Sequence, residues 1–178
     1  MHAQPTVTTT YGVALTVRPI APEDRERLAT AFERLSTLSR MQRFLAPKPR
    51  LNAAELTYLT EIDHRAHEAL VAVDPSRDRI VGVARYASEP DERGTADLAF
   101  VVADEWQGQG VGTMLTAQLV RRAAANGVER LTAATFADNR PARAVLRGLG
   151  FRTLGIGAGV VDLELRLRRP PAAGRSPA

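Results

Sequence analysis

The sequence predicts a mixed α/β fold in a single domain, and three observations support this prediction. The length of 178 residues fits one domain with one sizeable core. Hydrophobic residues make up 44% and charged residues 25%, which is typical of a globular protein. Strand-like and helix-like hydrophobic patterns follow one another in the order strand, two or three helices, three strands, helix, strand, helix, strand.

The first half of the chain is expected to form one strand and two or three helices after a disordered start at residues 1–12. Valines and a leucine alternate with small residues before a proline, which indicates a short strand. Hydrophobic residues then recur at helical spacing behind capping residues. The expected elements are a strand at 13–17, a helix after Asp24, a short helix at 37–45 and a helix after Asn52.

The second half is expected to alternate strands with helices after an initial hairpin. A turn-forming Asp-Pro-Ser-Arg-Asp run separates two apolar segments, which indicates the hairpin. Glycines follow both helical patterns, where a left-handed residue commonly ends a helix. The expected elements are strands at 69–73, 80–86 and 95–102, a helix at 113–126, a strand at 131–136, a helix after Asn139, and strands from Phe151 and at 161–167, followed by a disordered tail at 168–178.

Composition excludes several kinds of chemistry. The chain contains no cysteine, which excludes disulfides, thiolate zinc sites and an acyl-cysteine intermediate. His64 and His67 lie close in sequence but lack a third ligand, so no metal is expected. The net charge of +4 comes from arginines that alternate with acidic residues, and aromatic residues make up only 5%. This pattern indicates a solvated surface rather than a nucleic-acid-binding patch.

The hydrophobic pattern also bears on location. No apolar stretch approaches the roughly 20 residues of a membrane span, and the first residues lack the pattern of a secretory signal. We therefore expect a cytoplasmic protein with no membrane partner. The sequence leaves the oligomeric state open, with a homodimer among the options.

The most informative stretch is a glycine-rich loop between an apolar strand pattern and a helical pattern. Its residues are Gln107, Gly108, Gln109, Gly110, Val111, Gly112 and Thr113. Glycines let a backbone approach a ligand closely, and a helix N-terminus adds unsatisfied N–H donors, so the loop predicts a phosphate-bearing ligand. A Walker loop is excluded because Lys48 is the sole lysine. A dinucleotide fingerprint is excluded because its third glycine would fall at Thr113.

The loop reads Gln-x-x-Gly-x-Gly and resembles the acetyl-CoA pyrophosphate loop of the GNAT acyltransferases. A second motif, Asn139-Arg-Pro-Ala followed by Leu149-Gly-Phe, lies where that family has one. The resemblance covers residues 13–167, taken as the acyltransferase domain. It implies the GNAT fold, in which a mixed and mostly antiparallel central sheet is flanked by helices. It also implies acetyl-CoA as cosubstrate and no metal.

The resemblance assigns roles to the residues of both motifs. Backbone atoms of Phe100, Val101 and Val102 would pair with the pantetheine arm of the coenzyme as an added strand would. The loop at 107–113 would cradle the pyrophosphate. Asn139 would contact the cofactor, although it can equally well cap the helix that follows it.

A carboxylate is expected to act as general base, because an acceptor amine must lose a proton before it attacks a thioester. Asp97 is the candidate, since it interrupts an otherwise apolar strand pattern and since GNAT enzymes often place an acid near this position. The alternative is an outward-facing Asp on a half-exposed strand. Weaker candidates are Glu61, Asp63 and Glu68.

One position departs from the family pattern. Seven residues after the motif asparagine, many members have a tyrosine that protonates the departing CoA thiolate, and here that residue is Leu146. Leucine has no proton to donate, so either water serves or the thiolate leaves unprotonated. A CoA thiol has a pKa of about 8.5, like cysteine, which makes its thiolate a tolerable leaving group.

The acceptor half of the sequence resembles the bacterial Pat-type protein lysine acetyltransferases over residues 36–45, 51–63 and 69–72. This favours a protein lysine as acceptor, in a stand-alone domain. A small amine as acceptor and a catalytically silent acyl-CoA sensor are the alternatives. Arg40 and Arg43 lie on one helix face and could contact acidic groups of a substrate, but ion pairs within their own domain are favoured.

Overall fold

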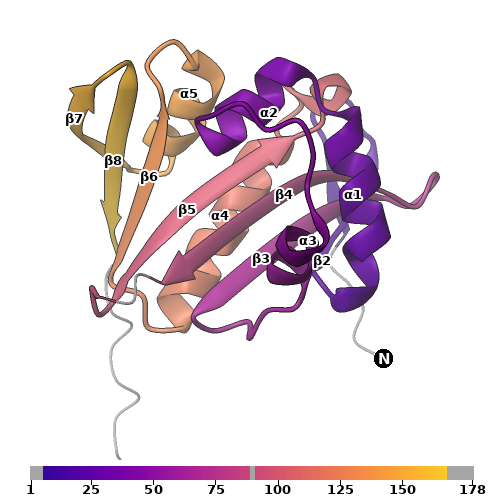
Figure 1. Ribbon diagram of the computed structural model, residues 1–178, viewed down its shortest axis with the longest axis horizontal. Helices are drawn as coiled ribbons and strands as arrows, with labels where there is room; N and C mark the ends of the chain where they lie inside the picture. The colour runs from indigo at the N-terminus through magenta and orange to yellow at the C-terminus, as the bar shows by residue number, and fades with distance from the viewer. Residues whose placement is uncertain (1–5, 89–90, 168–178) are drawn as a thin grey trace, which may run out of the picture.

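The computed structural model describes residues 6–88 and 91–167, which form one sheet with helices on both faces. The strands lie in the order β1-β2-β3-β4-β5-β6-β8-β7 (Figure 1). Every neighbouring pair is antiparallel except β5 and β6, which are parallel. The strands are β1 (Thr6–Thr8), β2 (Ala14–Pro19), β3 (His67–Asp74), β4 (Arg79–Ser88), β5 (Thr95–Val102), β6 (Arg130–Phe136), β7 (Arg152–Gly157) and β8 (Val160–Arg166).

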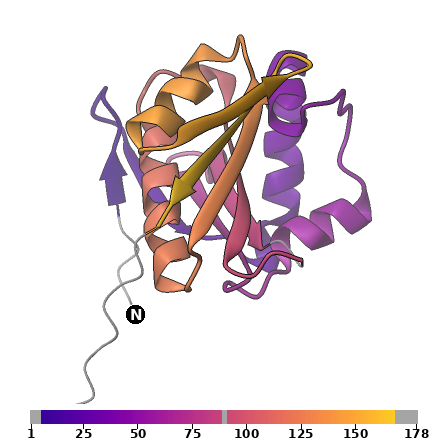
Figure 2. The same ribbon diagram turned by 90° about the vertical axis from the view of Figure 1, so that its left-hand side faces the viewer.

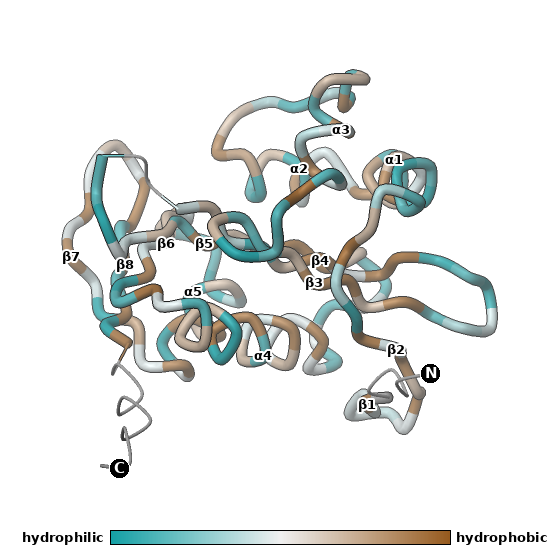
Figure 3. The backbone as a smooth tube through the Cα atoms, turned by 90° about the horizontal axis from the view of Figure 1, so that it is seen from below, coloured by the Kyte–Doolittle hydropathy of each residue, from teal (hydrophilic) through white to brown (hydrophobic). Residues whose placement is uncertain are grey.

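The helices form two layers around the sheet, as the views from the side and from below show (Figures 2 and 3). One layer contains α1 (Arg25–Arg34), α2 (Thr37–Phe44) and α3 (Ala53–Thr60), and the other contains α4 (Val111–Ala125) and α5 (Arg140–Gly148). Short 3-10 turns, η1 (Pro22–Asp24) and η2 (Asp104–Trp106), precede α1 and the glycine-rich loop. Within the described residues no helix has the length and hydrophobicity of a membrane span.

Each layer has its own hydrophobic core, as expected for a sheet buried on both faces. The larger core lies between the sheet and α4 and α5, and includes Leu98, Leu115, Leu119, Leu131 and Leu163. The smaller core lies beneath α1 and α3 and includes Ile20, Leu28, Val71 and Ile80. This confirms the predicted single α/β domain with a mixed, mostly antiparallel sheet.

Alternation along β5 determines which side chains face which layer. Leu98 and Val102 are buried in the core of α4 and α5. Asp97, Ala99 and Val101 therefore point to the opposite face, toward α2 and α3. One face of β5 is thus hydrophobic, and the opposite face carries the candidate base.

The ordered fold begins earlier than expected. Residues 6–8, placed by the sequence within a disordered segment, form β1 and pair with β2 through Val7 and Leu15. Val7 packs against the larger core, which explains why this Thr-Val-Thr run is extended although it is too short to show periodicity. Residues 1–5 and the expected disordered tail at 168–178 lie outside the described residues.

Helix starts were predicted with mixed success. The capping box at Asn52 is confirmed, because its Oδ1 accepts from Glu55 N at 2.9 Å and Glu55 Oε2 accepts from Asn52 N at 2.8 Å. Asp24 does precede α1, but its side chain makes no capping bond. Its carboxylate instead accepts from Arg18 at 2.6 and 2.7 Å. Although burial disfavours its charge, the bonds from Arg18 and Ala21 hold the pKa of Asp24 below its usual range.

Candidate active site

A cleft opens where β5 and β6 separate. The two strands are in register only from Thr95 to Asp97, after which β6 continues its pairing with β8 alone. The resulting cleft has a volume of about 490 Å³ and is lined by residues 98–102 of β5 and 133–135 of β6, with the glycine-rich loop at its mouth. From Val102 at the mouth to Asp97 at the closed end, the extended strand spans about 17 Å.

Backbone groups of β5 line this cleft in alternation. Ala103 N donates to Val81 O of β4 at 2.9 Å. In an antiparallel ladder every second residue then bonds to β4, so the backbone groups of Val101 point to β4. Those of Phe100 and Val102 point to the cleft. Of the three residues expected to pair with a pantetheine arm, Phe100 and Val102 thus turn their backbone groups to the cleft, whereas those of Val101 pair with β4.

Glycine is required at positions of this loop for two different structural reasons. Gly108 and Gly110 have φ angles of 72° and 83°, which side-chain-bearing residues rarely adopt. Gly112 is needed for close approach, because a Cβ there would lie 3.3 Å from the Phe100 ring. The loop therefore brings its backbone against the edge of β5.

The N-terminus of α4 lies at the mouth of the cleft. The helix begins at Val111, two residues before the predicted start, because Gly110 is its N-cap. Met114 N donates to Gly110 O at 3.0 Å, so the N–H groups of Val111, Gly112 and Thr113 precede the first bond within the helix. All three residues line the cleft, and the Val111 side chain is buried in the core. The amides and the positive helix end can receive a phosphate.

The two glutamines of the loop brace it with their side chains. Gln107 Nε2 donates to Val102 O and to Ser39 Oγ, both at 3.1 Å. Gln109 Nε2 donates to Glu105 O at 2.8 Å. The Gln107 side chain thus connects the loop to β5 and to α2 and fixes the loop at the mouth of the cleft.

A polar network that the sequence analysis missed holds α2 over the cleft. The Asp104 carboxylate accepts from Ser36 N, Ser36 Oγ and Ser39 Oγ at 2.9, 2.7 and 2.8 Å. Although burial disfavours its charge, these bonds hold the pKa of Asp104 below its usual range. Ser36 is the N-cap of α2, a role that its position could have indicated. Its carboxylate partner lies 68 residues away, beyond the reach of local patterns.

Asn139 and Leu146 line the inner wall of the cleft from α5 and the residue before it. Asn139 Oδ1 accepts from Ala142 N at 3.2 Å, so the capping role foreseen as the alternative is present in the structure. Leu146 is buried in the larger core and presents only hydrocarbon at the position of the family's tyrosine.

Asp97 lines a second cavity, of about 280 Å³, beneath α2 and α3. It is the last β5 residue in register with β6, opposite Thr132, whose Oγ1 lies 3.4 Å from its Oδ1. Arg43 and Ala99 line both this cavity and the cleft, so the two spaces meet at these residues. The exposed Asp97 carboxylate can therefore serve a reaction at the closed end of the cleft.

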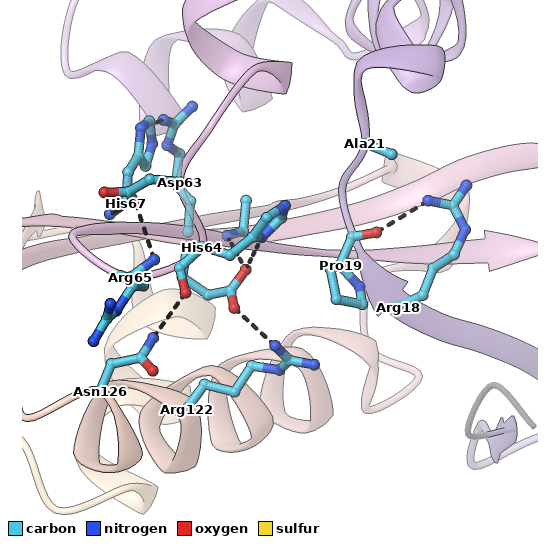
Figure 4. A network of polar contacts seen from close by, with 12 residues as sticks. Arg18, Pro19, Ala21, Asp63, His64, Arg65, His67, Arg122 and Asn126 are labelled. Atoms are coloured by element: carbon cyan, nitrogen blue, oxygen red, sulfur yellow. Dashed lines mark hydrogen bonds and ion pairs between the residues drawn. The ribbon is translucent and has the colours of Figure 1, made fainter. Parts of the chain in front are cut away.

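Two of the weaker acidic candidates, Glu68 and Asp63, and the nearby His64 have structural partners, while Glu61 lies exposed after α3. His64 Nδ1 lies 2.8 Å from Glu68 Oε1, and Arg122 donates to Glu68 Oε2 at 2.8 Å. Asn126 donates to His64 O at 3.0 Å, which joins the segment before β3 to α4 (Figure 4). Backbone N–H groups of Arg65 and His67 hold the pKa of Asp63 below its usual range. The described residues contain no group of three or more ligands able to hold a metal ion.

Arg40 and Arg43, which share a helix face, have different surroundings. Arg40 donates to the carbonyls of Leu35, Pro49 and Glu33 at 3.0, 2.7 and 2.7 Å, so its partners are backbone oxygens rather than the acids expected. The half-buried Arg43 lines both cavities and stacks on Phe44 at 4.9 Å. Burial lowers the pKa of its guanidinium, while Asp97 counteracts this effect.

The fold and the cleft define an acyltransferase domain, and sequence comparison identifies the family. Residues 33–151 match the acetyltransferase (GNAT) family. The chain belongs to the GNAT family of acetyltransferases.

Two characterised sequences show where the chain lies within this family. Acetyltransferase PA5475 of Pseudomonas aeruginosa is 35% identical over 137 residues, which cover 76% of this chain and 73% of that protein. Acetyltransferase Pat of Mycolicibacterium smegmatis is 30% identical over 149 residues, which cover 84% of this chain and 44% of that protein. The chain therefore spans less than half the length of this second relative.

Solved structures give the same result. The GNAT domain of S. lividans PAT superposes with a TM-score of 0.85 and 29% identity, over 94% of this chain and 99% of that one. These similarities support a Pat-type GNAT domain. The yncA protein of Salmonella typhimurium, solved with its cofactor acetyl-CoA, shares the fold with a TM-score of 0.71 and 17% identity, over 91% and 99% of the chains.

Proposed function

We propose that this protein is an acetyl-CoA-dependent N-acetyltransferase that moves the acetyl group directly to an amine, with a protein lysine as the favoured acceptor. The observation that carries the proposal is the cleft itself. It combines a backbone cradle at 107–113 with an open strand edge, and it meets the cavity that contains the Asp97 carboxylate.

The coenzyme would occupy the full length of this cleft. Its pyrophosphate would lie on the amides of Val111, Gly112 and Thr113, at the positive end of α4. Its pantetheine arm would extend along β5 and bond to the backbone of Phe100 and Val102 as an added strand does. This arrangement would direct the thioester toward Asp97 and would leave the space under α2 and α3 to the acceptor.

Asp97 would act as the general base. The carboxylate takes a proton from the acceptor ammonium, directly or through a water, and the neutral amine attacks the thioester carbonyl. A C–N bond forms, the C–S bond breaks, the CoA thiolate leaves, and the nitrogen releases its second proton to water to give the amide. Because Leu146 has no proton to donate, water protonates the thiolate after it departs.

The choice of a lysine acceptor is supported by the relatives. Pat of M. smegmatis and the GNAT domain of S. lividans PAT are similar to this chain across the acceptor-side helices as well as the cleft. Action in the cytoplasm belongs to the same proposal, which is compatible with a monomer or a homodimer. Neither a metal nor nucleic acid has a part in it.

Release of the CoA thiol from acetyl-CoA tests the proposal. We would measure it with a panel of lysine-containing peptides, folded proteins and small amines such as polyamines and amino acids. We expect release with lysine-containing proteins or peptides. Release with small amines alone would reassign the acceptor. The absence of release with every acceptor, while acetyl-CoA still binds, would replace the enzyme with a silent acyl-CoA sensor, the reading that Leu146 favours.

A further inference from the structure

We propose that Arg43 and Arg85 form an anion-binding subsite in the acceptor cavity, so that the preferred acceptor carries a carboxylate close to its amine. This inference rests on the proposed function and specifies the class of acceptor. Both guanidinium groups line the cavity that contains Asp97. Arg43 extends from α2, and Arg85 extends from β4, so the subsite exists only in the folded chain.

Arg85 is held in place by groups that leave its charge uncompensated. Its side chain is only 7% exposed, and its guanidinium lies 5.1 Å from the centre of the Tyr58 ring. Its Nη2 lies 3.5 Å from His67 Nδ1. A lowered pKa of about 4, due first to burial and then to Arg85, keeps His67 neutral at physiological pH. The neighbours therefore orient Arg85 without supplying a negative charge.

Arg43 adds a second positive charge to the same wall. Burial and then the charge of Arg43 lower the pKa of Arg85 to about 10, so Arg85 is still charged at neutral pH. Within residues 6–88 and 91–167, neither guanidinium has a carboxylate within the 4.0 Å that defines an ion pair. The other acid that lines the cavity, Glu55, forms an ion pair with Lys48.

The buried Arg85 and the half-buried Arg43 outnumber the one carboxylate, Asp97, that remains in their cavity beside the Glu55–Lys48 pair, and an excess of positive charge in a partly dry site is costly. A carboxylate of the acceptor would offset this excess, and guanidinium groups bind carboxylates with directed, charge-assisted hydrogen bonds. The same two cations would disfavour an ammonium in the cavity and so favour the neutral, nucleophilic amine. The subsite would thus contribute both to selection of the acceptor and to its activation beside Asp97.

Such a carboxylate has two sources, and both can be tested. In a protein acceptor it would belong to an Asp or Glu beside the target lysine. In a small acceptor it would be the carboxylate of an amino acid. We would compare lysine peptides flanked by Glu with matched peptides flanked by Gln, and amino acids with their carboxamides. In the pair that contains the true class of acceptor, we expect kcat/KM to be about tenfold higher for the acceptor with the carboxylate than for its neutral counterpart. A factor of about ten corresponds to one favourable ion pair in a partly dry site.

Three variants connect this preference to the subsite. Arg43→Gln and Arg85→Gln should each reduce the tenfold preference to about threefold or less, mainly through a higher KM for the acidic acceptor. Arg152→Gln, an exposed arginine on β7, should leave the preference unchanged. If Arg85→Gln fails to fold, the test rests on Arg43→Gln alone. Arg43 is only half-buried, so its replacement should leave the fold intact.

The outcomes separate this inference from the proposed function. Transfer to acidic and neutral acceptors at equal rates, or a preference that survives Arg43→Gln, would overturn the anion subsite and leave the acetyltransferase intact. The absence of transfer to all acceptors would overturn the proposed function instead. A preference for acids that both Arg variants lose would support the subsite.

Discussion

The coenzyme cleft and the acceptor cavity are built in different ways, although they meet at Arg43 and Ala99. The groups of the cleft that would bind the coenzyme belong largely to the backbone: the glycine-rich loop, the first amides of α4 and one edge of β5. The acceptor cavity is lined by side chains, most of them charged or aromatic, chiefly from α2, α3, β4 and β5. Backbone recognition suits a ligand shared by a whole family, whereas side-chain recognition lets the acceptor vary from one member to the next.

The largest effect is expected in the acceptor cavity, at the carboxylate beside the closed end of the cleft. Asp97→Asn should lower kcat for acetyl transfer by about 100-fold, because the amide cannot accept the acceptor's proton. Coenzyme affinity should be unchanged, since the Asp97 side chain faces away from the α4 layer that receives the diphosphate. Single-turnover assays and calorimetry measure the two quantities. Asp162→Asn, on the exposed face of β8, is the control and should leave both unchanged. A full rate in Asp97→Asn would remove Asp97 as the base.

A change in the backbone cradle should affect the cleft alone. Gly110→Val places a β-branched side chain at φ 83°, which should raise the Kd for acetyl-CoA by about tenfold or more. Gly127→Val is a matched control, because Gly127 follows the other end of α4 with φ 85°. It should cost similar stability and leave the Kd unchanged. Equal Kd increases in the two variants would show that strain in α4, rather than the cradle, controls affinity.

A smaller effect is expected where α2 joins the loop. Asp104→Ala removes the acceptor of three hydrogen bonds and leaves Ser36 and Ser39 without it. We expect the free energy of unfolding to fall by about 2 kcal/mol, measured by urea denaturation. The KM for the acceptor should also rise, because α2 carries Arg43. A loss of stability with no change in KM would show that α2 holds its place without Asp104.

The smallest effect concerns the pH dependence of stability beneath α3. The folded-state pKa of His67 is lowered to about 4, so the unfolded chain binds more protons between this value and about 6.5. The contribution of neutral His67 to the free energy of unfolding should therefore be fully present above about pH 6.5 and be lost as the pH drops toward 4. Because the ring is partly exposed, we expect a loss on the order of 1 kcal/mol relative to His67→Asn. Parallel stability curves for the two proteins would contradict the lowered pKa.

The fold and the coenzyme half of the site could be predicted because their signals are local. A glycine spacing, a helix start and an apolar strand lie within the 16 residues from Leu98 to Thr113. The same locality allowed the capping box at Asn52 to be predicted, and Gly127 to be placed after α4. The start of α4 was misplaced by two residues because the N-cap is a glycine without a side-chain signal.

The acceptor half could not be predicted because its contacts are distant in sequence. Arg43 and Arg85 are far apart in the chain, and nothing near Arg85 in an apolar strand marks it as a site residue. The difference between Arg40 and Arg43 depends on three backbone carbonyls that only the folded chain brings to Arg40. The strand β1 was missed for another reason, because its three residues are too few to show periodicity.

The thermal melting of the protein with acetyl-CoA tests most directly whether the cleft holds the coenzyme. At about 100 times its Kd, the ligand should stabilise the native state by roughly 2.7 kcal/mol. For a chain of this length the melting temperature should rise by roughly 5–10 °C, and Gly110→Val should show little of this rise at the same concentration. An unchanged melting temperature in the wild-type protein with acetyl-CoA and with longer acyl-CoAs would contradict the account.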